Sequence, residues 1–81
     1  MVTPEDIKGW IEQGIDDCQV EIEGDGQHFY ATIVSPAFSG KNRVQQHQMV
    51  YRALGDRMQE QIHALSMQTL SPEEHAASQA N

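Results

Sequence analysis

The chain has 81 residues, of which 38% are hydrophobic, with one cysteine and a formal net charge of −7. A chain of this length buries only about 60% of the surface that it exposes when unfolded. We therefore expect a single domain over residues 1–81, without a deeply buried active site. One cysteine excludes an internal disulfide. The acidic charge disfavours binding to a bare phosphate backbone, and no stretch reaches membrane-spanning length, so we expect a cytoplasmic protein.

The first predicted element is a helix that begins at Pro4. Thr3 can cap this helix, proline suits its first position, and Asp6 provides a weaker form of the capping box. An apolar stripe at spacings of three and four residues follows, formed by Ile7, Trp10, Ile11 and Ile15. Gly14 and the acidic pair at 16–17 mark the end of the helix.

Two strands follow and form a predicted hairpin. Apolar residues alternate over 18–23, residues 24–26 form a glycine-rich turn, and 29–34 is rich in aromatic and β-branched residues. Cys18 shares its strand parity with Val20, so we expect it to be a small buried hydrophobe. Pro36 ends the second strand, and the sequence predicts a connecting loop over 35–42.

The longest predicted helix begins after Asn42, which can cap it. Its apolar stripe comprises Val44, His47, Val50, Tyr51, Leu54, Met58 and Ile62. Gly55 is expected to bend this helix or divide it in two. A third strand is predicted over 64–70. The sequence S-P-E-E at 71–74 then opens a short C-terminal helix with a full capping box, and we expect the segment 71–81 to fray.

This order of elements predicts an α+β domain. It reads helix, strand, strand, helix (single or divided), strand, short helix. Three strands packed on one face by helices form a sandwich of two layers. No internal repeat, linker or low-complexity segment interrupts the pattern.

The usual enzymatic motifs are absent from the sequence. It contains no glycine-rich phosphate loop, no nucleophile elbow and no H-E-x-x-H. Solvent exposure accounts for Glu21, Glu23 and Asp25, which we place on the outer side of a strand and its turn. Glu73 and Glu74 serve helix capping and the helix dipole. We therefore predict that the protein is not an enzyme.

The four histidines are the candidate metal ligands. No two are spaced as a local chelate, and a closed zinc site needs four nitrogen or sulfur ligands. A metal would therefore take one or two ligands from this chain and the others from another molecule. We expect His47 to be half-buried and His75 to be exposed. His28 and His63 are placed at the rim of the sheet, and from the residues alone a packing role for His63 is favoured over a ligand role.

Nucleic-acid binding is the second candidate function. The order of elements resembles the KH architecture, in which a G-x-x-G loop clamps the backbone, but this sequence has no G-x-x-G. Lys41 and Arg43 flank the start of the long helix and could contact one phosphate. An ordinary solvated surface explains these two charges better.

Several ordered motifs resemble the BolA family. The run G-D-G-Q-H-F-Y-A-T-I-V-S-P-A-F-S-G-K-N-R-V-Q-Q-H-Q-M-V-Y-R-A-L is followed by I-H-A-L-S-M-Q-T-L-S-P-E-E. The short turn before H-F looks most like the IbaG-type (YrbA-like) bacterial branch of the family. The resemblance extends from about residue 4 to residue 75. It implies a fold similar to class II KH domains, in agreement with the predicted order.

The resemblance also implies a function. Family members partner monothiol glutaredoxins of the CGFS type and share a 2Fe–2S cluster with the glutaredoxin cysteine and glutathione. The family ligand in the H-A-L motif corresponds to His63. A second ligand or modulator, His or Cys in the family, comes from the hairpin-loop region, and the corresponding position here is His28. No cofactor is expected in the isolated chain, which would be a monomer or a weak homodimer.

Two departures from the family pattern affect these expectations. Many relatives have R-H-R where this chain has Gln46-His47-Gln48, so two positive charges are missing and DNA binding is further disfavoured. The P-E-E-W ending of the family appears here as P-E-E-H, and His75 is expected to leave the last helix looser than tryptophan would. We therefore predict that the protein is an adaptor in iron–sulfur cluster handling. The alternative is a KH-like transcriptional regulator that binds nucleic acid.

Overall fold

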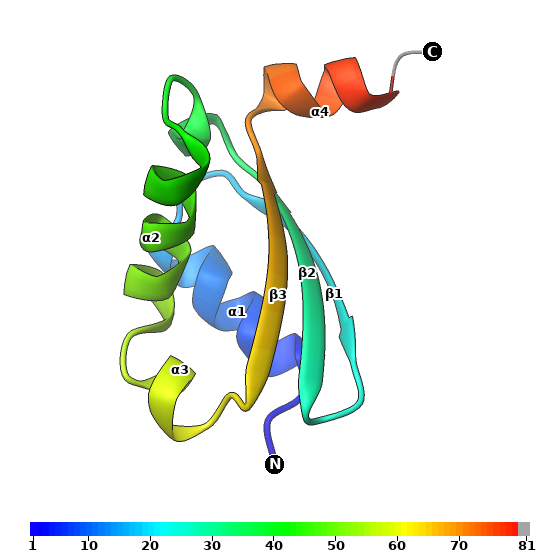
Figure 1. Cartoon of the computed structure of the whole chain (residues 1–81), viewed down its shortest axis with the longest axis vertical. Coiled ribbons are helices and arrows are strands. Elements are labelled where there is room, and N and C mark those ends of the chain that lie inside the picture. The colour runs from blue at the N-terminus through cyan, green and yellow to red at the C-terminus, as the bar shows by residue number, and fades with distance from the viewer. Residues whose placement is uncertain (80–81) are drawn as a thin grey trace.

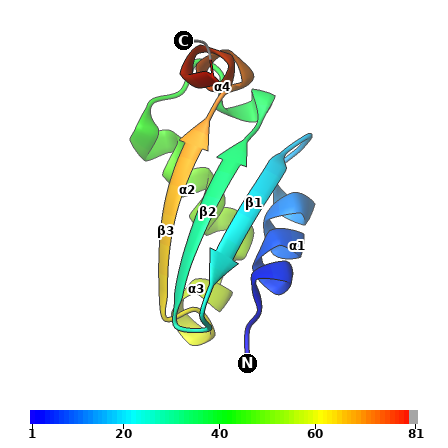
Figure 2. The ribbon, with the colours of Figure 1, turned by 90° about the vertical axis from the view of Figure 1, so that its right-hand side faces the viewer.

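A computed structural model describes residues 1–79 of the chain. It has two layers, a three-stranded sheet and a set of helices that cover one face of the sheet (Figures 1 and 2). The elements in chain order are α1 (Pro4–Gly14), β1 (Gln19–Gly24), β2 (His28–Val34), a short 3₁₀ helix (Pro36–Phe38), α2 (Arg43–Leu54), α3 (Arg57–Glu60), β3 (Ala64–Leu70) and α4 (Pro72–Gln79). The predicted α+β class and element order are confirmed.

The middle strand of the sheet is β2. It pairs antiparallel with β1 and parallel with β3, and the register places His28 opposite Ala64. A parallel pair needs a long crossover connection, which α2 and α3 supply here. As a result, the β1–β2 turn and the start of β3 lie at the same end of the sheet (Figure 1).

Helix α1 begins as its sequence predicts. The Thr3 backbone N–H donates to Asp6 Oδ2 at 3.0 Å, and the Asp6 N–H donates to Thr3 Oγ1 at 3.2 Å. This reciprocal pair satisfies two of the N–H groups that a helix start leaves without partners. Ile7 and Ile11 are fully buried, so the capped helix presents its apolar stripe to the sheet.

The hydrophobic core lies between the inner face of the sheet and the helices. Each strand turns alternate side chains inward, and α1 and α2 close the layer from the other side. The buried apolar residues are Ile7, Ile11, Ile15, Val20, Phe29, Ala31, Ile33, Phe38, Val50, Leu54, Ile62 and Leu70. Helices α1 and α2 pack closely at Gly14 and Ala53. The absence of a side chain on Gly14 permits this approach, since a Cβ there would lie 2.5 Å from the Ala53 Cβ.

The predicted apolar stripe of the long helix is wrong at two positions. Val44 is 65% exposed and Tyr51 is 44% exposed, whereas Val50 and Leu54 are buried. In the first turn of α2, the polar residue Gln46 occupies the buried position. The apolar pattern therefore predicted burial of the wrong face of the helix in this turn. The predicted division at Gly55 is confirmed, since this residue caps α2 with a φ of +59°.

The segment after β2 is more ordered than the predicted loop. Pro36–Phe38 form one turn of 3₁₀ helix. Ser35 Oγ accepts the N–H of Ala37 at 3.0 Å and donates to the carbonyl of Asp16 at 2.8 Å. This turn carries Phe38 into the core, where it is fully buried.

Gln46 ties α2 to the segment before it, to β3 and, through a hydrogen bond of 3.4 Å from its Nε2 to Glu74 Oε1, to α4. It is 2% exposed, and its Nε2 donates to the carbonyls of Phe38 at 3.2 Å and Lys41 at 3.0 Å. Thr69 Oγ1 of β3 donates to Gln46 Oε1 at 2.7 Å. Of the two glutamines that flank His47, only Gln48 is exposed, whereas Gln46 is buried.

Helix α4 begins with the predicted capping box. The Ser71 N–H donates to Glu74 Oε1 at 2.9 Å, and the Glu74 N–H donates to Ser71 Oγ at 3.1 Å. The helix then leaves the end of β3 and projects to the side of the sheet opposite α1 and α2 (Figure 1). His75 is half-buried, so its predicted exposure is wrong. The predicted fraying of 71–81 stays a prediction, and its last two residues lie outside the described part.

Within residues 1–79, none of the helices combines the length and the apolar character needed to cross a membrane.

Candidate metal-ligand site

The turn between β1 and β2 fixes the position of His28. Asp25 Oδ1 accepts the backbone N–H of Gln27 and that of His28, both at 2.9 Å. These two hydrogen bonds hold the pKa of the Asp25 carboxyl below its usual value, and the one from the His28 N–H has the larger effect. Solvation alone therefore does not account for Asp25. Its spacing of two and three residues from the donors is the signal of an Asx-type turn that sequence reasoning missed.

The start of β3 fixes the position of His63. The Ala64 N–H donates to the carbonyl of Gln27 at 3.0 Å, which joins the beginning of β3 to the hairpin turn. On the other side, Ile62 is buried in the core. His63 is held between these two anchors and lies at the rim, beside the turn that carries His28.

The two imidazole rings lie next to each other. Their centroids are 6.1 Å apart and their planes make an angle of 87°. Both residues are exposed, and neither ring takes part in a side-chain hydrogen bond among residues 1–79. The predicted rim placement is confirmed for both. Two accessible imidazoles with free nitrogens are suitable donors for iron or another borderline metal.

The surroundings of the pair do not complete a metal site. A hollow of about 410 Å³ adjoins His28 and is lined by Glu23, Gly24, Asp25, His28 and Tyr30. In the part of the chain that the structure describes, no group of three or more His, Cys, Asp or Glu residues could hold a metal ion. Among residues 1–79, the histidine pair therefore has no third such side chain grouped with it.

The remaining soft or nitrogen donors lie elsewhere. His47 is half-buried as predicted, and its Nε2 is buried without a hydrogen-bond partner among the described residues. Cys18 is half-buried rather than buried, with its Sγ 3.9 Å from the carbonyl oxygen of Ile11. Burial and the nearby Glu12 raise the pKa of this thiol, which disfavours the thiolate that a metal would need.

The alternative nucleic-acid residues lie at the other end of the fold. Lys41 and Arg43 are both exposed at the start of α2. Lys41, but not Arg43, lines a hollow of about 310 Å³ together with Gly40, Gln45, Gln48, Met49 and Arg52. The structure thus brings Lys41 near a second cation, Arg52, which the sequence analysis did not single out.

Comparison with known proteins shows the family and the fold of the chain. The family model described as BolA-like protein matches residues 12–74. The chain belongs to the BolA family. The resemblance to this family stated from the sequence is therefore confirmed.

Two curated relatives indicate the range of functions in this family. The DNA-binding transcriptional regulator BolA of Haemophilus influenzae is 39% identical over 54 residues, covering 67% of this chain and 52% of that protein. The acid stress protein IbaG of Escherichia coli K12 is 37% identical over 59 residues, covering 72% of this chain and 70% of that protein. The chain thus spans about half the length of the first relative.

Solved structures support the fold. A bolA protein homologue from Coxiella burnetii is 48% identical with a TM-score of 0.86, and the match covers 94% of this chain and 99% of that chain. The BolA domain of SufE1 from Arabidopsis thaliana is 32% identical with a TM-score of 0.76, covering 88% of this chain and 93% of that domain.

Proposed function

We propose that this protein is a non-enzymatic adaptor that supplies His63 and His28 to a 2Fe–2S cluster shared with a monothiol glutaredoxin. The glutaredoxin cysteine and glutathione provide the other ligands. The observation that carries the proposal is the pairing of the two exposed rings at 6.1 Å. Such a pair, without further donors beside it among the described residues, fits a cluster that a partner completes.

The chemistry of the donors supports a cluster role over a closed structural site. Nitrogen ligands on one iron raise the reduction potential of a 2Fe–2S centre relative to ligation by cysteine alone. Structural zinc sites use four protein ligands, and this surface offers two. We infer that the complex serves iron–sulfur cluster trafficking or the response to iron and stress.

The decisive experiment is optical. A monothiol glutaredoxin loaded with its cluster is titrated with the protein while visible absorption and circular dichroism are recorded. We expect both spectra to change to a saturable new form, because imidazole replaces a sulfur ligand. Spectra that stay those of the glutaredoxin alone contradict the proposal.

Histidine variants assign the ligands. We expect His63→Ala to abolish the spectral change and His28→Ala to weaken or alter it. His75→Ala is the matched control, since His75 lies in α4 at the opposite end of β3, and it should behave as the wild type. Far-ultraviolet circular dichroism confirms that each variant is folded. A His63→Ala variant with the wild-type spectrum would refute the assignment.

A KH-like transcriptional regulator is the second candidate function. It is favoured by the exposed Lys41 and Arg43, by the hollow that Lys41 and Arg52 line, and by the similarity to a relative named as a DNA-binding regulator. Binding to duplex DNA would weaken steeply with salt, and removing phosphate contacts would reduce that slope. Loss of binding in Lys41→Glu/Arg43→Glu, but not in Lys8→Glu/Arg57→Glu, would support it. DNA binding that is equal in both double variants would contradict it.

A further inference from the structure

Within residues 1–79, no helix lies along the outer face of the sheet. Helices α1, α2 and α3 all lie on the inner side, and Figure 2 looks directly onto the uncovered face. At one end of this face lie the β1–β2 turn and the start of β3. At the other end α4 projects outward (Figure 1). The uncovered face is therefore a bounded surface between the histidine pair and α4.

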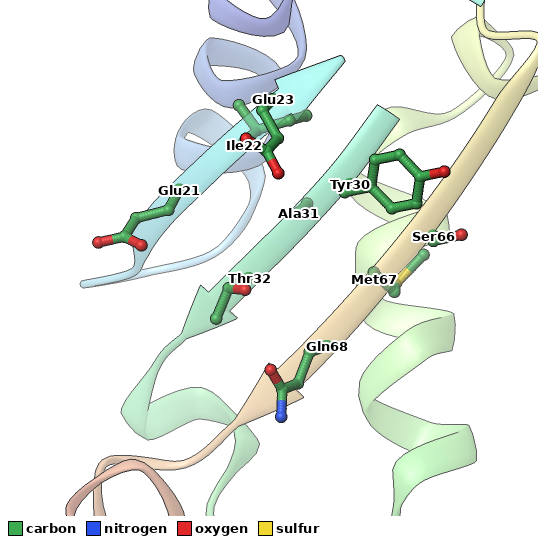
Figure 3. A pocket seen from close by; sticks show the side chains of 9 residues that line it. All are labelled: Glu21, Ile22, Glu23, Tyr30, Ala31, Thr32, Ser66, Met67 and Gln68. Atoms are coloured by element: carbon green, nitrogen blue, oxygen red, sulfur yellow. The ribbon is translucent and has the colours of Figure 1, made fainter. Parts of the chain in front are cut away.

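This face is hollowed and is polar along all three strands. A hollow of about 490 Å³ lies over it, and Figure 3 shows the nine residues that line it. The side chains that point outward alternate along the strands, and they are Glu21 and Glu23 of β1, Tyr30 and Thr32 of β2, and Ser66 and Gln68 of β3. We call these six residues the outer-face patch.

The register places these side chains in two rows across the sheet. Glu23 pairs with Tyr30, which pairs with Ser66. In the next row Glu21 pairs with Thr32, which pairs with Gln68. Side chains directly opposite one another on a sheet lie about 5 Å apart at Cβ. A ligand that lies along either row, from β1 to β3, therefore meets a carboxylate first. It then meets the ring of Tyr30 or the hydroxyl of Thr32, and finally the hydrogen-bonding side chain of Ser66 or Gln68.

The chemistry of the patch selects a cationic partner. Both glutamates are exposed, and the nine residues that line the hollow, all in the described part, include no lysine or arginine. Tyr30 is 55% exposed, and the face of such a ring attracts an ammonium or guanidinium group. The chain as a whole carries a net charge of −7, which favours encounter with a basic surface.

The patch is continuous with the histidine pair. Glu23 and Tyr30 line both the large hollow and the smaller one beside His28. His28 and Tyr30 also point to the same side, because they are two residues apart on β2. A protein that binds at the histidine pair and extends along the sheet therefore contacts the outer-face patch as well.

We propose that the outer-face patch is a second contact surface for the partner that completes the iron centre, and that it binds a segment bearing lysine or arginine. This inference rests on the proposed function for the identity of the partner. The partner presents its cations to Glu21 and Glu23 and stacks one of them on Tyr30. Ser66, Gln68 and Thr32 accept or donate hydrogen bonds to the same segment.

The test measures the affinity of the full chain for a cluster-loaded monothiol glutaredoxin at several salt concentrations. We expect Glu21→Gln/Glu23→Gln to weaken binding up to about tenfold at low salt, since exposed ion pairs contribute roughly 0.2–1 kcal/mol each. The loss should shrink at high salt, where screening removes these pairs. The final visible spectrum at saturation should equal that of the wild type, because the ligands are unchanged.

The control is Glu12→Gln/Glu60→Gln, which removes the same charge from exposed sites on α1 and α3. It should bind as the wild type does, which separates a local contact from the effect of net charge. Tyr30→Phe keeps the ring and should preserve affinity, whereas Tyr30→Thr should weaken it. Equal losses in the two double variants, or no loss in either, would overturn the inference.

The outcomes separate this inference from the function on which it rests. If the wild type leaves the cluster spectrum unchanged, the proposed function fails and the partner assignment fails with it. If His63→Ala abolishes the spectral change while Glu21→Gln/Glu23→Gln binds with wild-type affinity and salt dependence, only the second contact surface is refuted. Amide chemical-shift changes at Thr32, Ser66 and Gln68 on complex formation would support it independently.

Discussion

The rings of His28 and His63 lie 6.1 Å apart and nearly perpendicular, although the two residues are far apart in the sequence. One stands at the first residue of β2 and the other immediately precedes β3. The hydrogen bond from the Ala64 N–H to the Gln27 carbonyl closes the gap between the two segments. The geometry of the candidate site is thus a consequence of parallel strand pairing, and it does not require the two residues to be close in sequence.

The buried amide of Gln46 should be essential for stability. Gln46→Leu would leave Thr69 Oγ1 and the carbonyls of Phe38 and Lys41 without their partner. Each unsatisfied buried group costs about 1–3 kcal/mol, and burial of the leucine side chain offsets about 1.5–3 kcal/mol of the total, so we expect the free energy of unfolding to fall by about 2–4 kcal/mol. Denaturant unfolding measures this, with Gln48→Leu as the exposed control. A loss of equal size in the control would contradict the role of the network.

The attachment of α4 should depend on pH through Glu74. Hydrogen bonds from Ser71 hold the pKa of the Glu74 carboxyl below its usual value, and the one from the Ser71 backbone N–H has the largest effect. A carboxyl with a depressed folded pKa stabilises the fold above its unfolded pKa, about 4.3, and this contribution is lost as the pH falls through the folded pKa. Compared with Glu74→Ala, the wild type should therefore have slower amide exchange in α4 at neutral pH.

That difference should diminish below about pH 4, where the unfolded carboxyl of a glutamate is protonated. Glu60→Ala serves as the control, because Glu60 is exposed in α3 and caps no helix start. Exchange rates in α4 that are the same for Glu74→Ala and the wild type at neutral pH would refute the capping role.

Replacing His47 by an apolar residue should stabilise the fold. Its Nε2 is buried with no hydrogen-bond partner among the described residues, and burying such a group costs free energy. His47→Leu removes this cost, so we expect the free energy of unfolding at neutral pH to rise by about 1 kcal/mol. Thermal unfolding compares this variant with His75→Leu. Destabilisation by His47→Leu would mean that the nitrogen is satisfied in solution.

Two glycines of α1 should respond in opposite ways to alanine. A Cβ on Gly9 would meet no described atom within 4 Å, whereas one on Gly14 would lie 2.5 Å from the Ala53 Cβ. Gly9→Ala should stabilise the helix by about 0.5–1 kcal/mol, because alanine loses less backbone entropy. Gly14→Ala should cost about 1–3 kcal/mol through overpacking. Stabilisation by both substitutions would show that α1 and α2 can separate at Gly14 without cost.

Much of the local structure could be predicted from the sequence. The starts of α1, α2 and α4 lie where Thr3, Asn42 and Ser71 predicted them, and the observed capping boxes explain why. A cap joins groups three residues apart, so its donor and acceptor are both visible in the sequence. The third strand was likewise predicted over 64–70, and the motifs around His63 indicated the family.

The tertiary structure decided what depends on pairing between distant segments. The face of α2 that enters the core was mispredicted, because Gln46 is stabilised there by Phe38, Lys41 and Thr69 and not by its own hydrophobicity. The juxtaposition of His28 and His63 needed the parallel register of β2 and β3, and the bare outer face needed α1, α2 and α3 to pack on one side of the sheet. Sequence patterns encode local hydrogen bonds and burial, whereas the register and the choice of face follow from the packing of the whole chain.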